Sequence, residues 1–191
     1  MRKIFDDDIE KCLLVLRKGG LILYPTDTIW GIGCDATNAN AVEKIFHLKK
    51  RADEKAMIIL IASEKEVLKY AAHPDPEVFD YLKKQLRPTT VIYDGAIGLA
   101  DNLTGKDGSI AMRICNDEFC KDLIKRFRKP IVSTSANISG QAPPKIFTEI
   151  SEEIMNDVDH IVAYRQDDTT IAGPSSVIKW NKDGTITIIR S

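Results

Sequence analysis

Residues 21–33 read LILYPTDTIWGIG. The apolar residues 21–24 are typical of a buried strand, and the chain passes from them directly into the polar segment Pro25-Thr26-Asp27-Thr28. Ligand sites of α/β proteins gather at the ends of strands, so two hydroxyl groups and a carboxylate in this place could hold a small polar ligand. The same residues could instead form a tight turn in which the threonine and aspartate side chains bond their own backbone.

Helices and strands alternate on both sides of this segment, which predicts an α/β sheet protein. Aspartates at 6–8 favour the start of a helix, the glycine pair 19–20 favours its end, and Ser63 and Glu66 have the spacing of a capping box. The turn residues 181–184 predict a hairpin at the end of the sequence. The predicted helices cover about 6–18, 40–50, 63 onward, 75 onward, 116–129 and 149–155, and the predicted strands cover 21–24, 57–62, 89–93, 109–114, 131–133, 176–180 and 185–190.

The composition is that of an ordinary globular protein. The chain has 191 residues, of which 43% are hydrophobic and 29% are charged, and its formal net charge is −1. This length suits a fold that buries roughly 70% of its unfolded surface, and these fractions argue against disorder. We therefore expect residues 1–191 to form a single domain. The near-neutral charge excludes a globally basic nucleic-acid binder but not a local basic patch.

The cysteines and the hydrophobic runs predict a cytoplasmic protein. Cys12, Cys34, Cys115 and Cys120 include no C-x-x-C pair, so we expect reduced and mostly buried thiols, as in a reducing compartment. The N-terminal residues lack the apolar core of a secretory signal. No run approaches the ~18 apolar residues of a membrane span, so no membrane contact is predicted.

A cluster of cations precedes the predicted strand 57–62. Lys49, Lys50, Arg51 and Lys55 fall at the end of a predicted helix. Arginine can clamp a phosphate with two parallel hydrogen bonds and lysine can act as a point charge, so the cluster could bind phosphate groups. It could equally be a solvated helix C-terminus, where the helix dipole favours cations.

A third polar segment follows the predicted strand 131–133. Residues 133–140 read STSANISG and offer hydroxyl or amide groups at positions 133, 134, 135, 137 and 139. Such groups can bond phosphate oxygens, ribose or a base edge, or they can form an ordinary serine-rich turn. The patterns GxxxxGK[ST], GxGxxG and GxSxG do not occur, so a nucleotide would have to bind by another design.

The remaining polar groups suggest neither a metal site nor a catalytic histidine. His47, His73 and His160 are scattered, and each suits a structural or surface role. No cysteine or histidine grouping has metal-ligand spacing, so no protein-held metal is predicted. The basic run KRFRK at 125–129 could touch RNA phosphates or could be a solvated helix end.

Taken in order, these segments resemble the signature blocks of the YrdC family of threonylcarbamoyl-AMP synthases. The matching blocks are YPTDT at 24–28 with Gly31 and Gly33, KKR at 49–51 with Lys55, Arg113 within AMRI at 111–114, STSANISG at 133–140, GPSSVI at 173–178, and Arg190. The match runs from residue 19 to residue 190 in the family's order. Residues 85–90 depart from it, since they read QLRPTT where the family usually has WPGPLT, and Ala56 stands where the family often has proline.

The resemblance implies a fold and a reaction. The fold would be a twisted mixed α/β sheet with flanking helices and a large, concave, positively lined pocket. The reaction would convert L-threonine, bicarbonate and ATP into threonylcarbamoyl-AMP and pyrophosphate, with Mg²⁺ accompanying the ATP. A downstream tRNA threonylcarbamoyl transferase complex would use the product to modify the adenosine beside the anticodon. A contact of this chain with tRNA or double-stranded RNA belongs to the same expectation.

The resemblance also assigns roles to residues. Two anions have to meet in this reaction, so the site must neutralise charge before it can align atoms. Strand alternation puts Arg113 on the same face as Ala111, where a cation needs an anion, and the threonine carboxylate would supply one. The predicted ATP-binding residues are Lys49, Arg51, Lys55, Ser135, Asn137 and Arg190, and the predicted threonine-binding residues are Thr28, Thr90, Arg113 and Ser176. No covalent nucleophile or general base is assigned.

Two other functions stay open at this stage. A non-catalytic RNA-binding module on the same scaffold would use the lysine and arginine blocks equally well, although small uncharged groups such as Thr28 suit a small molecule better. A paralogue with another carbamoyl chemistry, such as a hydrogenase-maturation protein, would carry cysteine pairs and extra regions that this chain lacks. ATP–pyrophosphate exchange that depends on threonine and bicarbonate would identify the enzyme, and salt-sensitive RNA binding without exchange would identify the module.

Overall fold

The fold is built on one mixed sheet. The structure, a computed structural model, describes residues 2–50, 57–181 and 183–191. Within them, nine strands pair in the order β7-β1-β2-β6-β3-β5-β4-β8-β9, so the predicted mixed α/β sheet is confirmed. The strands are β1 (Ile22–Tyr24), β2 (Gly31–Gly33), β3 (Ile58–Ile61), β4 (Thr89–Tyr93), β5 (Ile110–Ile114), β6 (Ile131–Ser135), β7 (His160–Ile161), β8 (Ser176–Trp180) and β9 (Ile186–Arg190).

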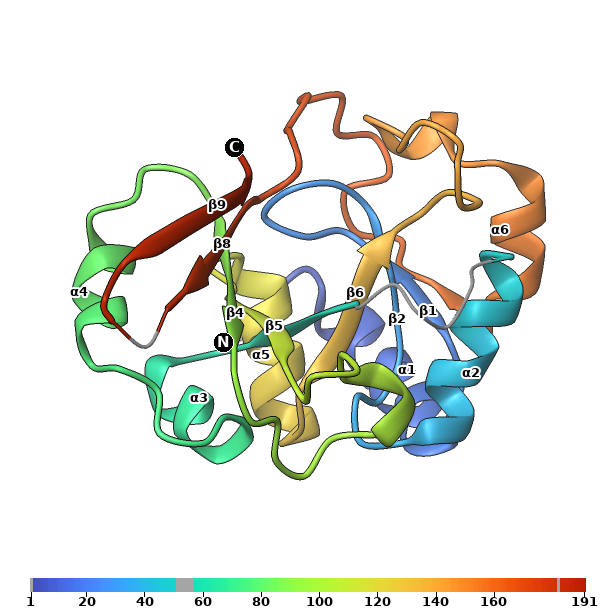
Figure 1. The fold of residues 1–191 in the computed structure, drawn as a ribbon. Coiled ribbons are helices and arrows are strands. Elements are labelled where there is room, and N and C mark those ends of the chain that lie inside the picture. The colour runs from blue at the N-terminus through green and yellow to red at the C-terminus, as the bar shows by residue number, and fades with distance from the viewer. Residues whose placement is uncertain (1, 51–56, 182) are drawn as a thin grey trace.

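Helices flank this sheet. Figure 1 shows α2 and α6 on one flank of the molecule and α3 and α4 on the other, and α1 packs against α5. The helices are α1 (Asp6–Arg17), α2 (Ala39–Leu48), α3 (Glu64–Tyr70), α4 (Glu77–Lys83), α5 (Glu118–Phe127) and α6 (Glu152–Asp157), with short 3₁₀ turns at Asp101–Leu103 and Phe147–Glu149. None of these described helices has the length and apolar character that a membrane crossing requires.

Local signals explain most of the helix starts. Asn38 accepts a hydrogen bond from the backbone N–H of Ala41, and Asp117 accepts one from that of Cys120, as N-cap residues do. The predicted capping box at α3 is only half formed. The Ser63 side chain makes no capping bond, and Glu66 reaches back to the N–H of Ala62 rather than to that of Ser63.

Two short strands were missed in the sequence, and a third is longer than predicted. β2 lies in the segment predicted as a loop, because its two glycines hide its strand character. Gly33 is required there, since a Cβ on it would come within 2.6 Å of the Tyr24 ring and 2.7 Å of the Val132 carbonyl oxygen. β6 continues to Ser135 where the prediction ended at 133, and the two-residue β7 carried no signal.

The core is apolar and contains the cysteines. Cys12, Cys34, Cys115 and Cys120 are all buried free thiols, as predicted. Burial in apolar surroundings disfavours the thiolate, and it raises the pKa of Cys12 to about 12. These thiols therefore act as small hydrophobic residues in the packing.

One face of the sheet forms the floor of the candidate site. β6, β3, β5 and β4 are neighbours, and their registers place Ser133 beside Ile58, Ile58 beside Ala111, and Ala111 beside Ile92. Side chains alternate along a strand, so Arg113 shares the face of Ala111. This row of small and apolar side chains, with one arginine at its edge, positions the site described next.

Candidate functional site

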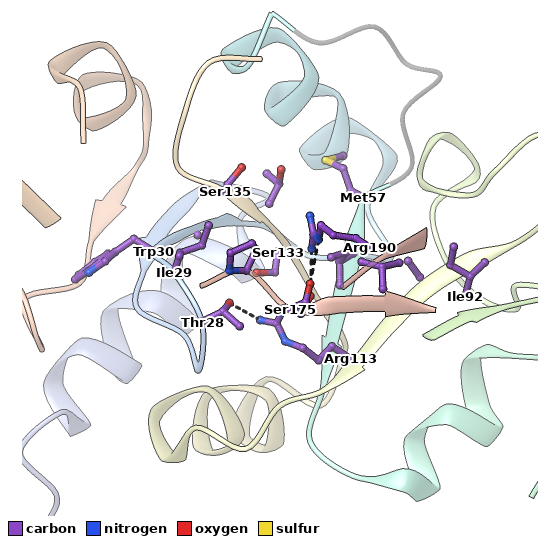
Figure 2. Close-up of a pocket in the computed structure, with 16 residues that line it drawn as sticks. Thr28, Ile29, Trp30, Met57, Ile92, Arg113, Ser133, Ser135, Ser175 and Arg190 are labelled. Carbon is purple, nitrogen blue, oxygen red and sulfur yellow. Dashed lines mark hydrogen bonds between the residues drawn. The ribbon is translucent and has the colours of Figure 1, made fainter. Parts of the chain in front are cut away.

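A cavity of about 280 Å³ lies over this face of the sheet. Figure 2 shows it between the β1–β2 loop and the hairpin of β8 and β9. Its described lining has four parts. The β1–β2 segment contributes Thr28, Ile29, Trp30 and Gly31, and β6 contributes Ser133, Thr134 and Ser135. The strands β3, β5 and β4 contribute Ile58, Ala111, Arg113 and Ile92, with Met57 just before β3. The last part comprises Pro174 and Ser175 just before β8, Val177 on β8 and Arg190 on β9. Two of these residues are cations, and none of those described is acidic.

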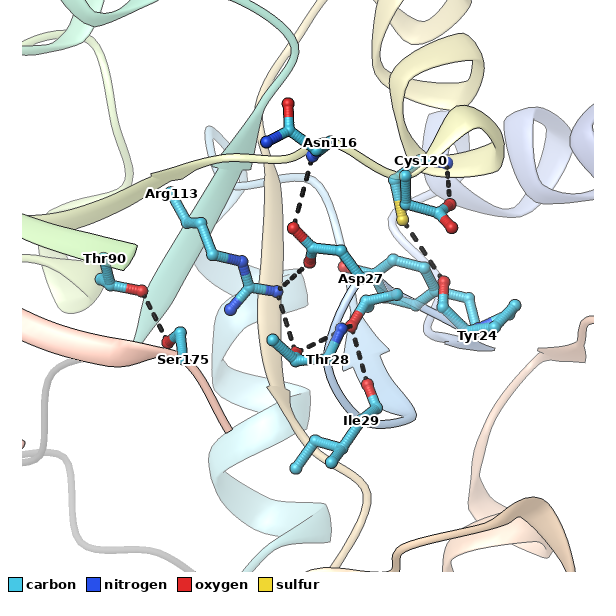
Figure 3. Close-up of polar contacts among 12 residues, drawn as sticks. Tyr24, Asp27, Thr28, Ile29, Thr90, Arg113, Asn116, Cys120 and Ser175 are labelled. Carbon is cyan, nitrogen blue, oxygen red and sulfur yellow. Dashed lines mark hydrogen bonds and ion pairs between the residues drawn. The ribbon is translucent and has the colours of Figure 1, made fainter. Parts of the chain in front are cut away.

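Arg113 is the buried cation of the cavity. It is 3% exposed, on the face that strand alternation predicted. Its Nη2 lies 3.0 Å from Asp27 Oδ1 and donates to Thr28 Oγ1 at 3.2 Å (Figure 3). Asp27 Oδ2 in turn accepts from the N–H of Asn116 at 3.3 Å. A carboxylate of the protein therefore already balances the charge of Arg113, and the guanidinium is held in one orientation.

Arg190 reaches the cavity from β9, at the edge of the sheet. Its Nε donates to the Ser175 carbonyl oxygen at 3.0 Å, and its Nη2 lies 3.4 Å from Ser175 Oγ. Partial burial and the positive charge of Arg113 lower the pKa of Arg190 below its ordinary value. The second of these causes is the repulsion between the two guanidinium groups, both of which line the cavity.

Lys49 holds the segment after β6 through hydrogen bonds to its backbone. This lysine is 2% exposed and does not line the cavity. Its ammonium donates to the carbonyl oxygens of Ser135 and, at 2.5 Å, Asn137, while its own carbonyl accepts from the N–H of Ser139 at 2.9 Å. The structure therefore directs the ammonium of Lys49 at the backbone of the loop, and its contact with phosphate stays a prediction.

Asn137 is a loop residue as well. Its Nδ2 donates to the carbonyl oxygens of Ile138 at 3.0 Å and Gln141 at 2.8 Å, so the side chain closes the turn after β6. It lies outside the described lining, whereas Ser135 lies within it. Of the two polar residues predicted to bind ATP from this loop, the structure brings Ser135 to the cavity.

Ser176 and Thr90, both predicted to bind threonine, lie outside the described lining of the cavity. Ser175 and Val177 both line the cavity, so Ser176 between them points to the other face of the strand. Thr90 is fully buried, and its hydroxyl lies 2.8 Å from Ser175 Oγ. Ser175, the residue just before β8, is therefore the serine that lines the cavity, and the Thr90 hydroxyl contacts it.

The remaining predicted residues either line the cavity or lie outside the described part of the chain. Thr28, Arg113, Ser135 and Arg190 are brought together around the cavity, and Arg51 and Lys55 lie outside the described residues. Asp27 and Ser175 were missed. Asp27 stands inside the quoted motif between the two threonines, and a search for the anion that a buried Arg113 needs would have found it.

The basic run 125–129 is partly neutralised by neighbouring acids. Arg126 Nη2 lies 2.6 Å from Asp6 and its Nη1 lies 3.3 Å from Glu10. Lys129 Nζ lies 2.6 Å from Asp35. Two of its four cations therefore belong to ion pairs, so this run gives the RNA-binding alternative no specific support.

Comparisons with known proteins bear on what the cavity does. The chain matches the family model Sua5_yciO_yrdC, described as "Telomere recombination", over residues 14–191. It is 34% identical over 153 residues to the threonylcarbamoyl-AMP synthase of Photobacterium profundum, and this alignment covers 78% of the chain and 82% of that relative.

Solved structures give the same picture. Sua5 from P. abyssi complexed with L-threonine is similar with a TM-score of 0.84 at 26% identity, and the match covers 99% of this chain. The chain spans only 55% of that Sua5 chain. YciO from E. coli is similar with a TM-score of 0.82 at 25% identity, and the match covers 97% of this chain and 89% of YciO.

Proposed function

The chain belongs to the Sua5/YciO/YrdC family, and we propose that it is a nucleotidyltransferase that makes threonylcarbamoyl-AMP and pyrophosphate from L-threonine, bicarbonate and ATP. The observation that carries the proposal is the pairing of Arg113 with Thr28 in the cavity wall. A guanidinium can take the carboxylate of an amino acid and the hydroxyl oxygen beside it can accept from its amino group. The curated relatives that carry the same activity in their names support this assignment.

ATP would occupy the part of the cavity between β6 and the end of β9. Ser135 offers a hydroxyl from one side and Arg190 a cation from the other. Arg51 and Lys55 are proposed as further phosphate ligands because of their positions in the sequence. Loss of either charge-assisted bond would weaken ATP binding by about 1.5–3 kcal/mol. Lys49 contributes by shaping the loop that presents Ser135.

Positioning and charge neutralisation would provide most of the catalysis. The threonine amine forms a bond to the carbon of bicarbonate with loss of water, and one oxygen of the resulting carbamate attacks the α-phosphate and expels pyrophosphate. Both reactants of the second step are anionic, so the two arginines would reduce their repulsion while the walls align them. None of the described lining residues is acidic, which keeps the negative charge of the protein behind Arg113 rather than against the substrates.

Mg²⁺ is proposed as a companion of ATP rather than as a resident ion. Among the described residues, no group of three histidine, cysteine, aspartate or glutamate side chains could hold a metal. A Mg²⁺ ion would therefore take its ligands from phosphate oxygens and water, which is its usual arrangement with nucleotides. Its contribution would be to neutralise phosphate charge during the transfer.

Partners beyond the small substrates follow from the same proposal. The product is a mixed anhydride, so a separate tRNA threonylcarbamoyl transferase complex would consume it in the cytoplasm. Direct contact of this chain with tRNA or double-stranded RNA remains a prediction.

The proposal is tested by supplying the purified protein with ATP, Mg²⁺, threonine and bicarbonate. Threonylcarbamoyl-AMP and pyrophosphate should appear by mass spectrometry, and ATP–pyrophosphate exchange should depend on both threonine and bicarbonate. Omission of each substrate in turn is the control. Salt-sensitive RNA binding without any exchange would contradict the proposal and favour a non-catalytic module.

A further inference from the structure

Thr26 is a buried hydroxyl residue that lies behind the cavity and contacts a residue in its wall. It is 6% exposed, whereas Thr28 lines the cavity. Thr26 Oγ1 donates to the Ile29 carbonyl oxygen at 2.8 Å and accepts from the N–H of Thr28 at 3.0 Å. The two threonine hydroxyl oxygens also lie 3.0 Å apart.

These contacts determine where each hydroxyl proton points. A carbonyl oxygen only accepts, so the single hydroxyl proton of Thr26 is used for Ile29. The contact between the two hydroxyls therefore uses the proton of Thr28, which donates to Thr26. Thr28 Oγ1 also accepts from Arg113 Nη2 at 3.2 Å. Of its one proton and two lone pairs, Thr28 retains one lone pair for a ligand and no proton.

The group beside Thr28 has the opposite polarity. A guanidinium only donates, so Arg113 and Thr28 form a donor and an acceptor next to each other in the wall. An α-amino acid presents the complementary pair, because its carboxylate accepts, its ammonium donates, and a single carbon separates them. The wall is therefore complementary to an α-amino acid in its hydrogen-bond donors and acceptors as well as in its charge.

We propose that Thr26 is a positioning residue that determines specificity. It fixes the Thr28 hydroxyl as a hydrogen-bond acceptor, and the cavity therefore selects substrates that carry an α-ammonium group. The inference rests on the proposed function, since it concerns threonine. Without the Thr26 hydroxyl, the proton of Thr28 is free to turn toward the cavity, and Thr28 can then donate to a ligand as readily as it accepts from one. The preference for an ammonium group should fall.

The test compares threonine with 3-hydroxybutanoate, which is threonine without its ammonium group. Binding of both compounds is measured calorimetrically with wild-type protein, Thr26→Val and Thr26→Ser. Wild type should bind threonine at least about tenfold more tightly. Thr26→Val should reduce this ratio about fivefold through weaker threonine binding, with the affinity for ATP unchanged, while Thr26→Ser, which keeps the hydroxyl, should preserve the ratio. An unchanged ratio in Thr26→Val, or an equal loss for both compounds, would overturn the proposal.

A further variant controls for the hydrogen bonds that Thr26→Val loses. Thr26→Val also removes the partners of the Ile29 carbonyl and the Thr28 N–H. Thr26→Cys replaces the hydroxyl with a thiol, a weaker donor and acceptor, so its ratio should be intermediate, and it decides the matter if Thr26→Val does not fold. If wild type binds neither compound, the proposed function fails. If wild type binds threonine and the ratio survives in the variants, only the role of Thr26 fails.

Discussion

Two arginines reach the cavity from contrasting parts of the sheet. Arg113 lies on β5 among paired strands, is 3% exposed and has the carboxylate of Asp27 at 3.0 Å. Arg190 ends the edge strand β9, is exposed, and bonds to backbone and hydroxyl oxygens of Ser175. Within the described part of the chain Arg190 has no carboxylate partner. Among the described residues, a carboxylate balances the charge of Arg113 but none balances that of Arg190.

This difference suggests a division of labour. A buried cation without an anion would be costly, so Asp27 makes the burial of Arg113 tolerable and fixes its direction. Such a group suits a ligand with one carboxylate that has to be oriented. Arg190 keeps its net charge near solvent, which suits a ligand that carries several charges, such as the triphosphate of ATP.

Removal of Arg113 should have the largest effect. Arg113→Ala leaves the Asp27 carboxylate in a buried place without its cation and facing the substrate carboxylate. The free energy of unfolding should fall by about 3–5 kcal/mol. The apparent KM for threonine should rise at least about tenfold, with ATP affinity in the absence of threonine almost unchanged. Chemical denaturation and steady-state kinetics measure the two effects.

Arg126→Ala is the matched control for this variant. Arg126 forms two ion pairs, with Asp6 and Glu10, where Arg113 forms one, but the Arg126 side chain is 38% exposed. Its loss should cost at most about 1 kcal/mol and leave threonine use unaffected. If Arg113→Ala leaves threonine use untouched, or weakens ATP binding alone, the division of labour between the two arginines is wrong.

Lys49 extends the comparison to a third cation, which backbone carbonyl groups balance. Lys49→Met keeps much of the side-chain volume but leaves the carbonyl oxygens of Ser135 and Asn137 without this donor. The free energy of unfolding should fall by about 2–3 kcal/mol, and ATP binding should weaken because the loop loses its shape. Lys50→Met is the control, since Lys50 is exposed and pairs with Glu153 at the surface. A stable Lys49→Met protein with normal ATP binding would contradict the role of Lys49 in holding the loop.

Arg190→Ala should affect the nucleotide rather than the amino acid. The affinity for ATP should fall about tenfold, which corresponds to about 1.4 kcal/mol. Because Arg190 lies near solvent, salt should screen its contribution, so the difference from wild type should narrow between low and high ionic strength. Titration of ATP at two salt concentrations tests this. A threonine KM that rises as much as it does in Arg113→Ala would show that both arginines serve the amino acid.

Much of the fold, including the position of Arg113, could be predicted from the sequence. The α/β class, most helices and strands and the placement of Arg113 on an inward face follow from periodicity and strand alternation. The short β2 did not, because Gly33 is needed there for close approach to Tyr24 and Val132 rather than for strand propensity.

Side-chain direction was harder to predict than position. Lys49 was expected to contact phosphate because lysine is a cation, but in the fold it points at two carbonyl groups 86 and 88 residues further along the chain. Ser176 was predicted to bind threonine, whereas it is its neighbour Ser175 that lines the cavity. The Lys49 contacts join segments far apart in the chain, and the choice between Ser175 and Ser176 depends on where the strand begins to alternate. A motif in the sequence encodes neither.

The smallest expected effect distinguishes charge from geometry at the two arginines. Arg190→Lys keeps a cation near solvent, so ATP affinity should stay within about threefold of wild type. Arg113→Lys also keeps the charge, but a lysine ammonium lacks the planar guanidinium whose Nη2 contacts both Asp27 and Thr28 while its other N–H groups stay available to a carboxylate, so most of the threonine defect of Arg113→Ala should persist. Parallel kinetics on the two lysine variants provide the measurement. If lysine rescues Arg113 as well as it rescues Arg190, then charge alone accounts for both residues, and the ion pair with Asp27 has no orienting role.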